Sequence, residues 1–279
     1  MKAQAKRAAI QFIKSLVWLL LLSIGLLACN PQAEKNKYIL AERLFGDRKY
    51  DAAVSEFQKI IENNPRSPLA QQALFRVGII QYLYLEKYSD AVKSLRQFTL
   101  LSQNGDAVYE AEKNIGEIYF SKIEDFRSSL DQYKRILDKY PESKEKDFFL
   151  FRIAKSYYGF LDFDNAIQTY ERIKKETPKS PLVLEASYQI GNTYYTRGDC
   201  DTAIKVFREV VKEKPSAQQA VFSQFGIANC YEEQQKYQEA IDQYEQIVDK
   251  HPSKNVVLRK IQKLKVLREK TKPTKKYGL

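Results

Sequence analysis

The chain has 279 residues and a formal net charge of +11, from 46 lysines and arginines against 35 acidic residues. Ten of the basic residues and a single glutamate lie in 253–279, so the excess charge is concentrated at the C-terminus and does not indicate a nucleic-acid-binding body. With one histidine and three cysteines, the composition also argues against a metal site built from several such ligands.

The first 28 residues predict an export signal. Four basic residues and no acidic residue accompany the apolar run SLVWLLLLSIGLLA at 15–28. This run is shorter than the ~20 residues that span a bilayer, which is typical of a signal-peptide core.

The end of this segment, Leu26-Leu27-Ala28-Cys29, resembles the lipobox of bacterial lipoproteins. The resemblance implies cleavage before Cys29, diacylation of its thiol and acylation of the new amino group, which together make a stable anchor. In the sorting rule of such lipoproteins, Asn30 after the cysteine favours the outer membrane over the inner membrane. The alternative is an uncleaved N-terminal membrane anchor with an incidental cysteine, and in both cases the rest of the chain lies outside the cytoplasm.

A period of 37 or 38 residues then runs through most of the chain. One column of small residues consists of Ala53, Ala91, Ser129, Ala166, Ala203 and Ala240. Four residues further on, a column of large apolar residues consists of Phe57, Leu95, Tyr133, Tyr170, Phe207 and Tyr244. Three residues before the small column stand Tyr50, Tyr88, Phe126, Phe163, Cys200 and Tyr237. A fixed period of this size, with helical spacing inside it, predicts a solenoid of amphipathic helix pairs.

The pattern resembles the tetratricopeptide repeat (TPR), although the usual period is ~34 residues. The resemblance covers 34–252 and implies an all-α solenoid of six helix pairs, in which each repeat buries its apolar face against the next. An unrelated helical bundle is the alternative. Because no linker interrupts the repeats, we expect one continuous domain after a lipidated tether at 29–33, with polar residues continuing to Lys37.

Proline is expected to end five of the six repeats, at Pro65, Pro141, Pro178, Pro215 and Pro252. Repeat two has Gln103 at this place, which predicts a looser exit through Asn104 and Gly105.

After the repeats, the apolar spacing of Val257, Ile261, Leu264 and Leu267 predicts a basic capping helix at 253–270 with a polar outer face. Its basic residues are either a solvated cap or a contact surface for an acidic partner or anionic lipid head groups. A flexible tail is expected at 271–279.

The sequence gives no support to catalysis. The single histidine, His251, precedes a proline at a helix end, where capping or solvent exposure is its ordinary role. There is no Cys-x-x-Cys, no glycine-rich phosphate loop and no nucleophile elbow in the sequence. We therefore expect a protein that is not an enzyme and that uses no cofactor, no metal and no small-molecule substrate.

Two cysteines remain if Cys29 carries lipid. Cys200 stands in the aromatic column of repeat five, and Cys230 lies on the expected first helix of repeat six. Outside the cytoplasm the pair either forms a disulfide between the two repeats or consists of two small buried thiols.

The candidate binding residues follow from the TPR resemblance. In that fold, fixed positions of each first helix line the concave face and hold peptides. In repeats four to six these positions hold Phe148, Phe151, Tyr158, Glu185, Tyr188, Asn192, Tyr195, Phe222, Phe225, Asn229 and Glu232. Aromatic rings offer a large contact area, and an asparagine amide can hydrogen-bond both groups of a peptide backbone. The alternative is that some of these rings only pad the solenoid.

A lipobox together with a TPR array resembles two families of envelope lipoproteins. One is the BamD type, which acts in outer-membrane β-barrel assembly, and the other is the YbgF/CpoB type, which coordinates Tol–Pal and peptidoglycan. The chain lacks the coiled-coil segment of the second type, and it has six repeats where the first type has five. The resemblance implies a lipid-anchored scaffold of the bacterial envelope whose partner is another envelope protein, with the β-barrel assembly machinery favoured. A peptidoglycan-associated factor and a pilotin-type secretion or pilus lipoprotein are the alternatives.

Overall fold

The computed structural model describes residues 31–271, and in this range every regular element is helical. The elements are α2 (Pro31–Gly46), α3 (Tyr50–Asn63), α4 (Pro68–Leu83), α5 (Tyr88–Leu101), α6 (Gly105–Ile118), the π-helical turn η1 (Tyr119–Ile123), α7 (Phe126–Lys139), α8 (Lys146–Gly159), α9 (Phe163–Glu176), α10 (Val183–Thr196), α11 (Cys200–Glu213), α12 (Gln218–Glu233), α13 (Tyr237–Ile247) and α14 (Lys254–Thr271). The predicted all-α class is confirmed, with a final helix after the repeats. Cys29 and the export signal lie outside the described residues.

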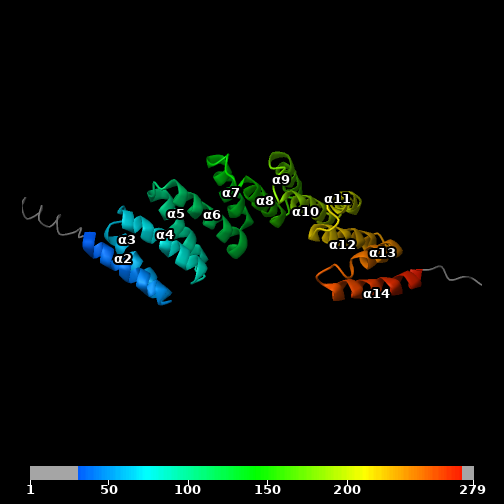
Figure 1. Cartoon of the computed structure of the whole chain (residues 1–279), viewed down its shortest axis with the longest axis horizontal. Coiled ribbons are helices and arrows are strands. Elements are labelled where there is room, and N and C mark those ends of the chain that lie inside the picture. Colours follow the sequence, from blue (N-terminus) through cyan, green and yellow to red (C-terminus); the bar gives the residue numbers. More distant parts are fainter. Residues whose placement is uncertain (1–30, 272–279) are drawn as a thin grey trace, which may run out of the picture. The chain divides into compact units, whose positions relative to one another are not determined.

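The described chain divides into two compact units, and each is considered by itself. The first comprises 31–118 with α2 to α6, and the second comprises 119–271 with η1 and α7 to α14. Figure 1 labels the helices in chain order, from blue through green to red. The boundary falls inside the third predicted repeat, so the prediction of one continuous domain stays a prediction.

The predicted columns form the core. All six members of the small-residue column are 0 % exposed, and all six members of the following apolar column are at most 1 % exposed. Small residues are also needed on the first helices, because the ring of Phe207 lies against both Gly191 in α10 of its own repeat and Gly226 in α12 of the next. A methyl group added at Gly191 or Gly226 would stand 2.6 Å or 2.5 Å from this ring, so the helices could not approach as closely with a larger residue.

The turn inside each repeat has one fixed conformation. The residue two positions before every second helix has a positive φ, between 54° and 87°, at Arg48, Glu86, Glu124, Leu161, Gly198 and Gln235. Only repeat five places glycine there, where a positive φ costs little. The turn geometry is therefore set by packing of the helix pair and not by turn residues.

Two predicted boundaries are wrong. From Pro31 on, the predicted tether at 29–33 and the polar residues that continue it to Lys37 are already part of α2, which begins at Pro31. Its first turns contain Ala, Glu and Lys, which favour helix, and a proline at the first helical position breaks no hydrogen bond. The loop after repeat two is also tighter than predicted, since the Asn104 side chain accepts a hydrogen bond from the Ala107 amide at 3.1 Å and closes a three-residue connection to α6.

The last helix differs from the prediction on its outer face. Val257, Ile261 and Leu264 are buried against α13, as the sequence predicted. The outer face is not uniformly polar, because Leu258 and Val266 are 45 % and 52 % exposed. These two residues are eight apart and form a second apolar stripe, separate from the predicted stripe of Val257, Ile261, Leu264 and Leu267. Within 31–271, no helix is both long enough and apolar enough to cross a membrane.

Candidate functional site

The first-helix surface is the name we give to the predicted binding residues of α8, α10 and α12. It consists of Phe148, Phe151, Tyr158, Tyr188, Asn192, Tyr195, Phe222, Phe225 and Asn229. All nine are partly buried, so each has one side in contact with the fold and another side accessible.

Three rings of this surface share one position of the repeat. Phe151, Tyr188 and Phe225 follow one another at intervals of 37 residues. Each packs on a ring in the second helix of its own repeat, with centroid distances of 5.6 Å to Tyr170, 6.0 Å to Phe207 and 5.4 Å to Tyr244. Part of each ring therefore packs within its helix pair, and only the remaining part is available to a ligand.

The row of rings continues between repeats. Phe222 lies 6.0 Å from Tyr188 and 5.8 Å from His251, and His251 stacks on Phe225 at 4.8 Å. His251 thus joins the aromatic row, and its Nδ1 accepts a hydrogen bond from the Ser253 amide at 3.0 Å. The sequence placed this histidine at a helix end but did not predict its aromatic contacts.

At the other end of the row, Phe148 contacts Phe149 at 5.6 Å and Tyr133 at 6.2 Å. The Arg152 guanidinium lies 5.1 Å from the Phe148 ring and 4.4 Å from the Phe120 ring of η1. Such cation–π contacts hold a positive charge beside the aromatic row.

The two asparagines of the surface differ in what they can offer. The side chain of Asn229 is occupied, because its oxygen accepts hydrogen bonds from the Tyr244 hydroxyl at 2.6 Å and the Lys260 ammonium at 2.9 Å. The side chain of Asn192 has no hydrogen-bond partner in the described part of the chain and is partly exposed. Only Asn192 is therefore ready to bind a peptide backbone without first losing a contact.

Glu232 shares the surroundings of Asn229. Partial burial opposes its ionisation, but hydrogen bonds from Lys260 at 2.7 Å and Lys263 at 3.0 Å outweigh this and hold the pKa of Glu232 below its ordinary value. The group of Asn229, Glu232 and Lys260 joins α12 to α14, so it acts as a structural contact.

Two tyrosines connect neighbouring first helices. The hydroxyls of Tyr158 and Thr196 hydrogen-bond at 2.9 Å, and the Tyr195 hydroxyl donates to Glu233 at 2.7 Å. Burial and the Glu233 carboxylate raise the pKa of Tyr195, so it stays a neutral donor. Each pair is 38 residues apart, which fixes one repeat against the next along the surface.

The cysteine pair is present as two buried free thiols. Cys200 donates to Glu233 at 3.4 Å, and burial raises the pKa of both Cys200 and Cys230. Both belong to one core cluster between repeats five and six. Of the two alternatives left open by the sequence, the structure contains the pair of thiols.

Lys155 was not among the binding residues predicted from the sequence. This residue precedes Asn192 by 37 positions and therefore takes the place of an asparagine in α8. Its ammonium lies 5.8 Å from the Phe151 ring and has no carboxylate partner among residues 31–271. The period of 37 residues that relates Asn192 to Asn229 also leads to Lys155. It was the sequence signal for this residue, although a lysine and not an asparagine stands there.

A second missed feature is a hollow of about 330 Å³ in the first unit. It is lined by α2, α4, the end of α5 and the start of α6, and its residues include Tyr38, Gln71, Gln72, Phe75, Phe98 and Asn104. The turn after α4 is one residue longer than the turn after α10. With this extra residue taken into account, Phe75 holds the same position in its repeat as Tyr188. It too packs on a ring of its own second helix, Phe98, at 5.2 Å.

The first-helix surface offers contact area and hydrogen-bonding groups. Within the described residues, no cluster of three or more His, Cys, Asp or Glu side chains could hold a metal ion. What the surface presents is a row of half-buried rings with one open amide and one ammonium.

Comparison with known proteins agrees with this architecture. Two models described as tetratricopeptide repeat match residues 149–180 and 188–255. No curated protein sequence matches the chain significantly.

Several solved structures are similar in fold. One is a tetratricopeptide repeat protein from Parabacteroides merdae, with a TM-score of 0.56, 17 % identity, and coverage of 85 % of this chain and 88 % of that chain. The apo form of RapI has a TM-score of 0.59, 16 % identity, and coverage of 85 % and 72 %. PilW has a TM-score of 0.52, 16 % identity, and coverage of 82 % and 100 %. At these identities the likeness shows the fold alone, and the fold of this chain is that of a TPR solenoid with a C-terminal helix.

Proposed function

We propose that the protein is a non-catalytic scaffold of the bacterial cell envelope that binds an extended segment of a partner protein on the first-helix surface. The observation that carries this proposal is the open Asn192 amide beside half-buried rings. Rings already fixed by packing lose little conformational entropy when a ligand covers them, and a free amide can pair with a backbone N–H and C=O.

Lys155 adds a preference to this surface. Its ammonium is held over Phe151 and is not neutralised by a carboxylate in the described chain. A bound segment with an acidic residue near α8 would gain a charge-assisted contact there. We therefore infer a partner segment that is aromatic or aliphatic with at least one carboxylate.

A capture experiment tests the proposal. Asn192→Ala and Lys155→Ala remove groups that no other residue of the described chain binds by hydrogen bond or ion pair, so the fold should be unaffected. Purified from envelopes with its bound proteins, the double variant should recover at least about tenfold less partner than the unchanged chain. Asn63→Ala at the end of α3 is the matched control, and equal recovery by all three proteins would reject the surface as the binding site.

The second part of the proposal is the tether. We propose that Cys29 carries lipid and anchors the repeats at the outer membrane, facing the periplasm. Metabolic labelling with a fatty-acid analogue should label the chain, and Cys29→Ser should lose the label and move the protein to the soluble fraction. Labelling that survives Cys29→Ser would remove this anchor.

The β-barrel assembly machinery is the partner that we favour, because the lipobox and the TPR pattern resemble the BamD type. A role in Tol–Pal and peptidoglycan coordination, as in the YbgF/CpoB type, remains the alternative from the same resemblance. Sedimentation with purified sacculi separates it from the first.

A pilus or secretion lipoprotein of the pilotin type is a further candidate. The structure of PilW, described as a type IV pilus biogenesis factor, is similar over the whole of that chain. Identification of the captured proteins decides between a barrel-assembly component and a pilus component.

A further inference from the structure

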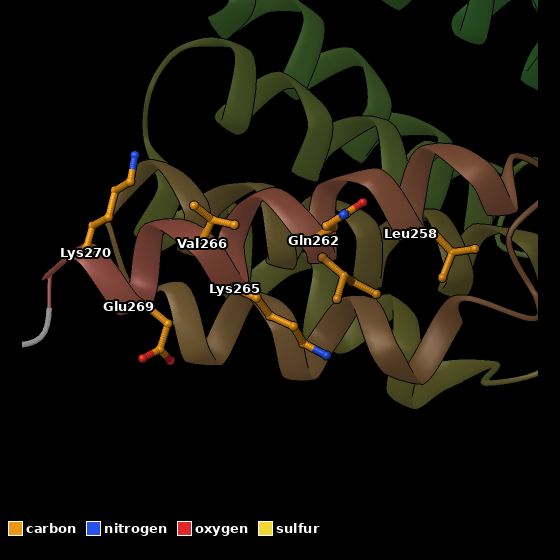
Figure 2. Close-up of a pocket in the computed structure, with 7 residues that line it drawn as sticks. Leu258, Gln262, Lys265, Val266, Glu269 and Lys270 are labelled. Atoms are coloured by element: carbon orange, nitrogen blue, oxygen red, sulfur yellow. The ribbon is translucent and has the colours of Figure 1, made fainter.

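The outer face of α14 carries a shallow hollow of about 770 Å³. Figure 2 shows Leu258 and Val266 on this face with Gln262 between them and Lys265, Glu269 and Lys270 around them. The exposed fractions of Leu258 and Val266, 45 % and 52 %, are high for apolar residues of a helix that already buries another stripe.

The repeat register explains what this face is. The residues at the position of Phe75, Phe151, Tyr188 and Phe225 each contact a ring in the second helix of their own repeat. Gln262 follows Phe225 by 37 residues and holds the same position in α14. α14 is thus the first helix of a seventh repeat, and its exposed face is the one that a second helix covers in the preceding repeats.

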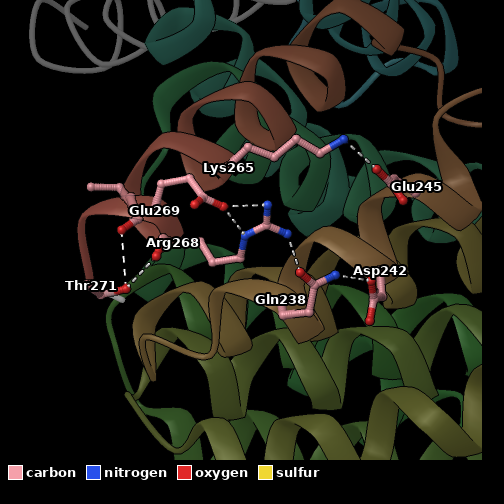
Figure 3. Close-up of polar contacts among 8 residues, drawn as sticks. Gln238, Asp242, Glu245, Lys265, Arg268, Glu269 and Thr271 are labelled. Atoms are coloured by element: carbon pink, nitrogen blue, oxygen red, sulfur yellow. Dashed lines mark hydrogen bonds and ion pairs between the residues drawn. The ribbon is translucent and has the colours of Figure 1, made fainter. Parts of the chain in front are cut away.

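One residue makes this face differ from the earlier repeats. Gly78, Gly191 and Ala228 share a column in which a small side chain lets the second helix approach. The next member, 37 residues after Ala228, is Lys265. Figure 3 shows its ammonium turned aside to Glu245 of α13, at 2.8 Å, so that its hydrocarbon stem borders the hollow.

Polar contacts hold α14 in place behind this face. The Arg268 guanidinium donates to Gln238 of α13 and pairs with Glu269 at 2.9 Å (Figure 3). The Gln238 side chain in turn donates to Asp242 at 2.7 Å. The exposed stripe therefore sits on a fixed helix, which lowers the cost of binding to it.

Charge indicates which kind of helix fits. α14 contains seven basic residues and one acidic residue. Lys270 borders the hollow, Arg259 directly follows Leu258 in the helix, and neither makes an ion pair within residues 31–271. A second copy of α14 would bring like charges together, and the sequence after Thr271 adds Lys272, Lys275 and Lys276. A second copy of α14 and the chain's own basic C-terminal residues are therefore poor occupants of the outer face of α14. Carboxylates complement the basic residues around it.

We propose that the outer face of α14 binds an acidic amphipathic helix of a partner protein, which takes the place of the missing second helix of the seventh repeat. Its apolar stripe would cover Leu258 and Val266, and its carboxylates would pair with Arg259 and Lys270. This interface is separate from the first-helix surface and stands or falls independently of it.

The test uses two synthetic helical peptides with the same leucine stripe, one flanked by glutamates and the other by lysines. Binding to the full chain in detergent is measured by fluorescence anisotropy. The glutamate peptide should bind, the lysine peptide should bind at least about tenfold more weakly, and added salt should weaken the first. Leu258→Ser with Val266→Ser should reduce affinity by at least about tenfold. Leu100→Ser with Leu161→Ser, which changes exposed leucines elsewhere, is the matched control and should bind as the unchanged chain does.

Three results would overturn the proposal. One is absence of binding, or equal binding of the two peptides. Another is concentration-dependent self-association of the unchanged chain that Leu258→Ser with Val266→Ser abolishes, since a second copy would then be the occupant. The third is binding of the glutamate peptide only after removal of 272–279, because the face would then belong to the chain's own C-terminal segment.

Discussion

At the scale of single residues, the side chains of the first-helix surface differ in how much of each is used in packing. Tyr188 contacts Phe207 below it and Phe222 beside it, at 6.0 Å each, and keeps only part of its ring accessible. The side chain of Asn192, one turn further along α10, makes no hydrogen bond within the described residues. This difference makes Asn192 the better probe of function, because we expect that loss of its side chain leaves the fold intact.

The contact of Phe207 with two glycines gives a prediction about stability. Gly226→Ala would place a Cβ 2.5 Å from the Phe207 ring. The usual gain from replacing a helical glycine, up to about 1 kcal/mol, should be outweighed by overpacking of about 1–3 kcal/mol. The free energy of unfolding from denaturant titration should therefore fall.

Gly46→Ala is the control for this prediction, since a Cβ built there meets no atom within 4 Å apart from its chain neighbours and the backbone of its own helix. It should be neutral or slightly stabilising. If Gly226→Ala behaved in the same way, the close approach of α12 to Phe207 would be wrong.

A group of ion pairs within repeat four, between α8 and α9 and inside α9, predicts a pH dependence. Hydrogen bonds from Arg172 and Lys146 lower the pKa of Glu176 to about 2. Since the unfolded value is higher, about 4.3, the folded state is favoured by this group above that pH, and the contribution disappears as the pH falls toward 2. Glu176→Gln should lower the unfolding temperature at pH 7 and have little effect near pH 2.

Glu213→Gln at the exposed end of α11 serves as the comparison for Glu176→Gln, because Glu213 has no basic partner in the described chain. A difference between the Glu176 variant and the unchanged chain that persisted at pH 2 would show that the carboxylate acts through packing and not through its charge.

At the scale of elements, helix pairs and their buried columns could be predicted from the sequence, because a period of 37 or 38 residues places the same residue types at each seam. The columns that contain Ala203 and Phe207 identified the helix pairs. The turn conformation could not be predicted, since Arg48 and Leu161 carry no sequence signal for a positive φ. The proposed binding residues could be predicted only in part. The Asn229 side chain is occupied by a hydrogen bond from Lys260, and this contact depends on how α14 packs.

The turn of repeat four contains the clearest local conflict. Leu161 has a φ of 66° and is 68 % exposed. Its left-handed backbone conformation is unfavourable for a residue with a Cβ, and its exposed side chain contributes little packing to offset this cost. Leu161→Gly should raise the free energy of unfolding by roughly 0.5–1 kcal/mol, because relief of strain exceeds the added entropy of the unfolded chain. Leu161→Ala keeps the Cβ and should give no such gain, and equal stability of the two variants in a denaturant titration would contradict the explanation.

At the scale of the whole molecule, we propose two separate faces for partners. The first-helix surface joins rings, an amide and an ammonium, and the outer face of α14 joins an apolar stripe with a basic rim. The sequence predicted the first from the repeat register. It did not predict the second, because a stripe of only Leu258 and Val266 is too short to be seen as a helical period.

The identity of a partner could not be predicted from the fold. In our proposal the TPR solenoid fixes where binding residues lie, while the choice of ligand depends on a few side chains such as Lys155. The proposed anchor at Cys29 would limit possible partners to proteins of the envelope, which is why the tether and the surface belong to one functional proposal.

The most direct test of the central claim is photo-cross-linking in living cells with a photoreactive amino acid at position 192. The claim predicts one dominant cross-linked envelope protein from position 192 and none from position 213 on the opposite helix of the same repeat, with both proteins folded and at equal abundance. A folded chain that cross-links from neither position, or equally from both, would contradict the role of the first-helix surface.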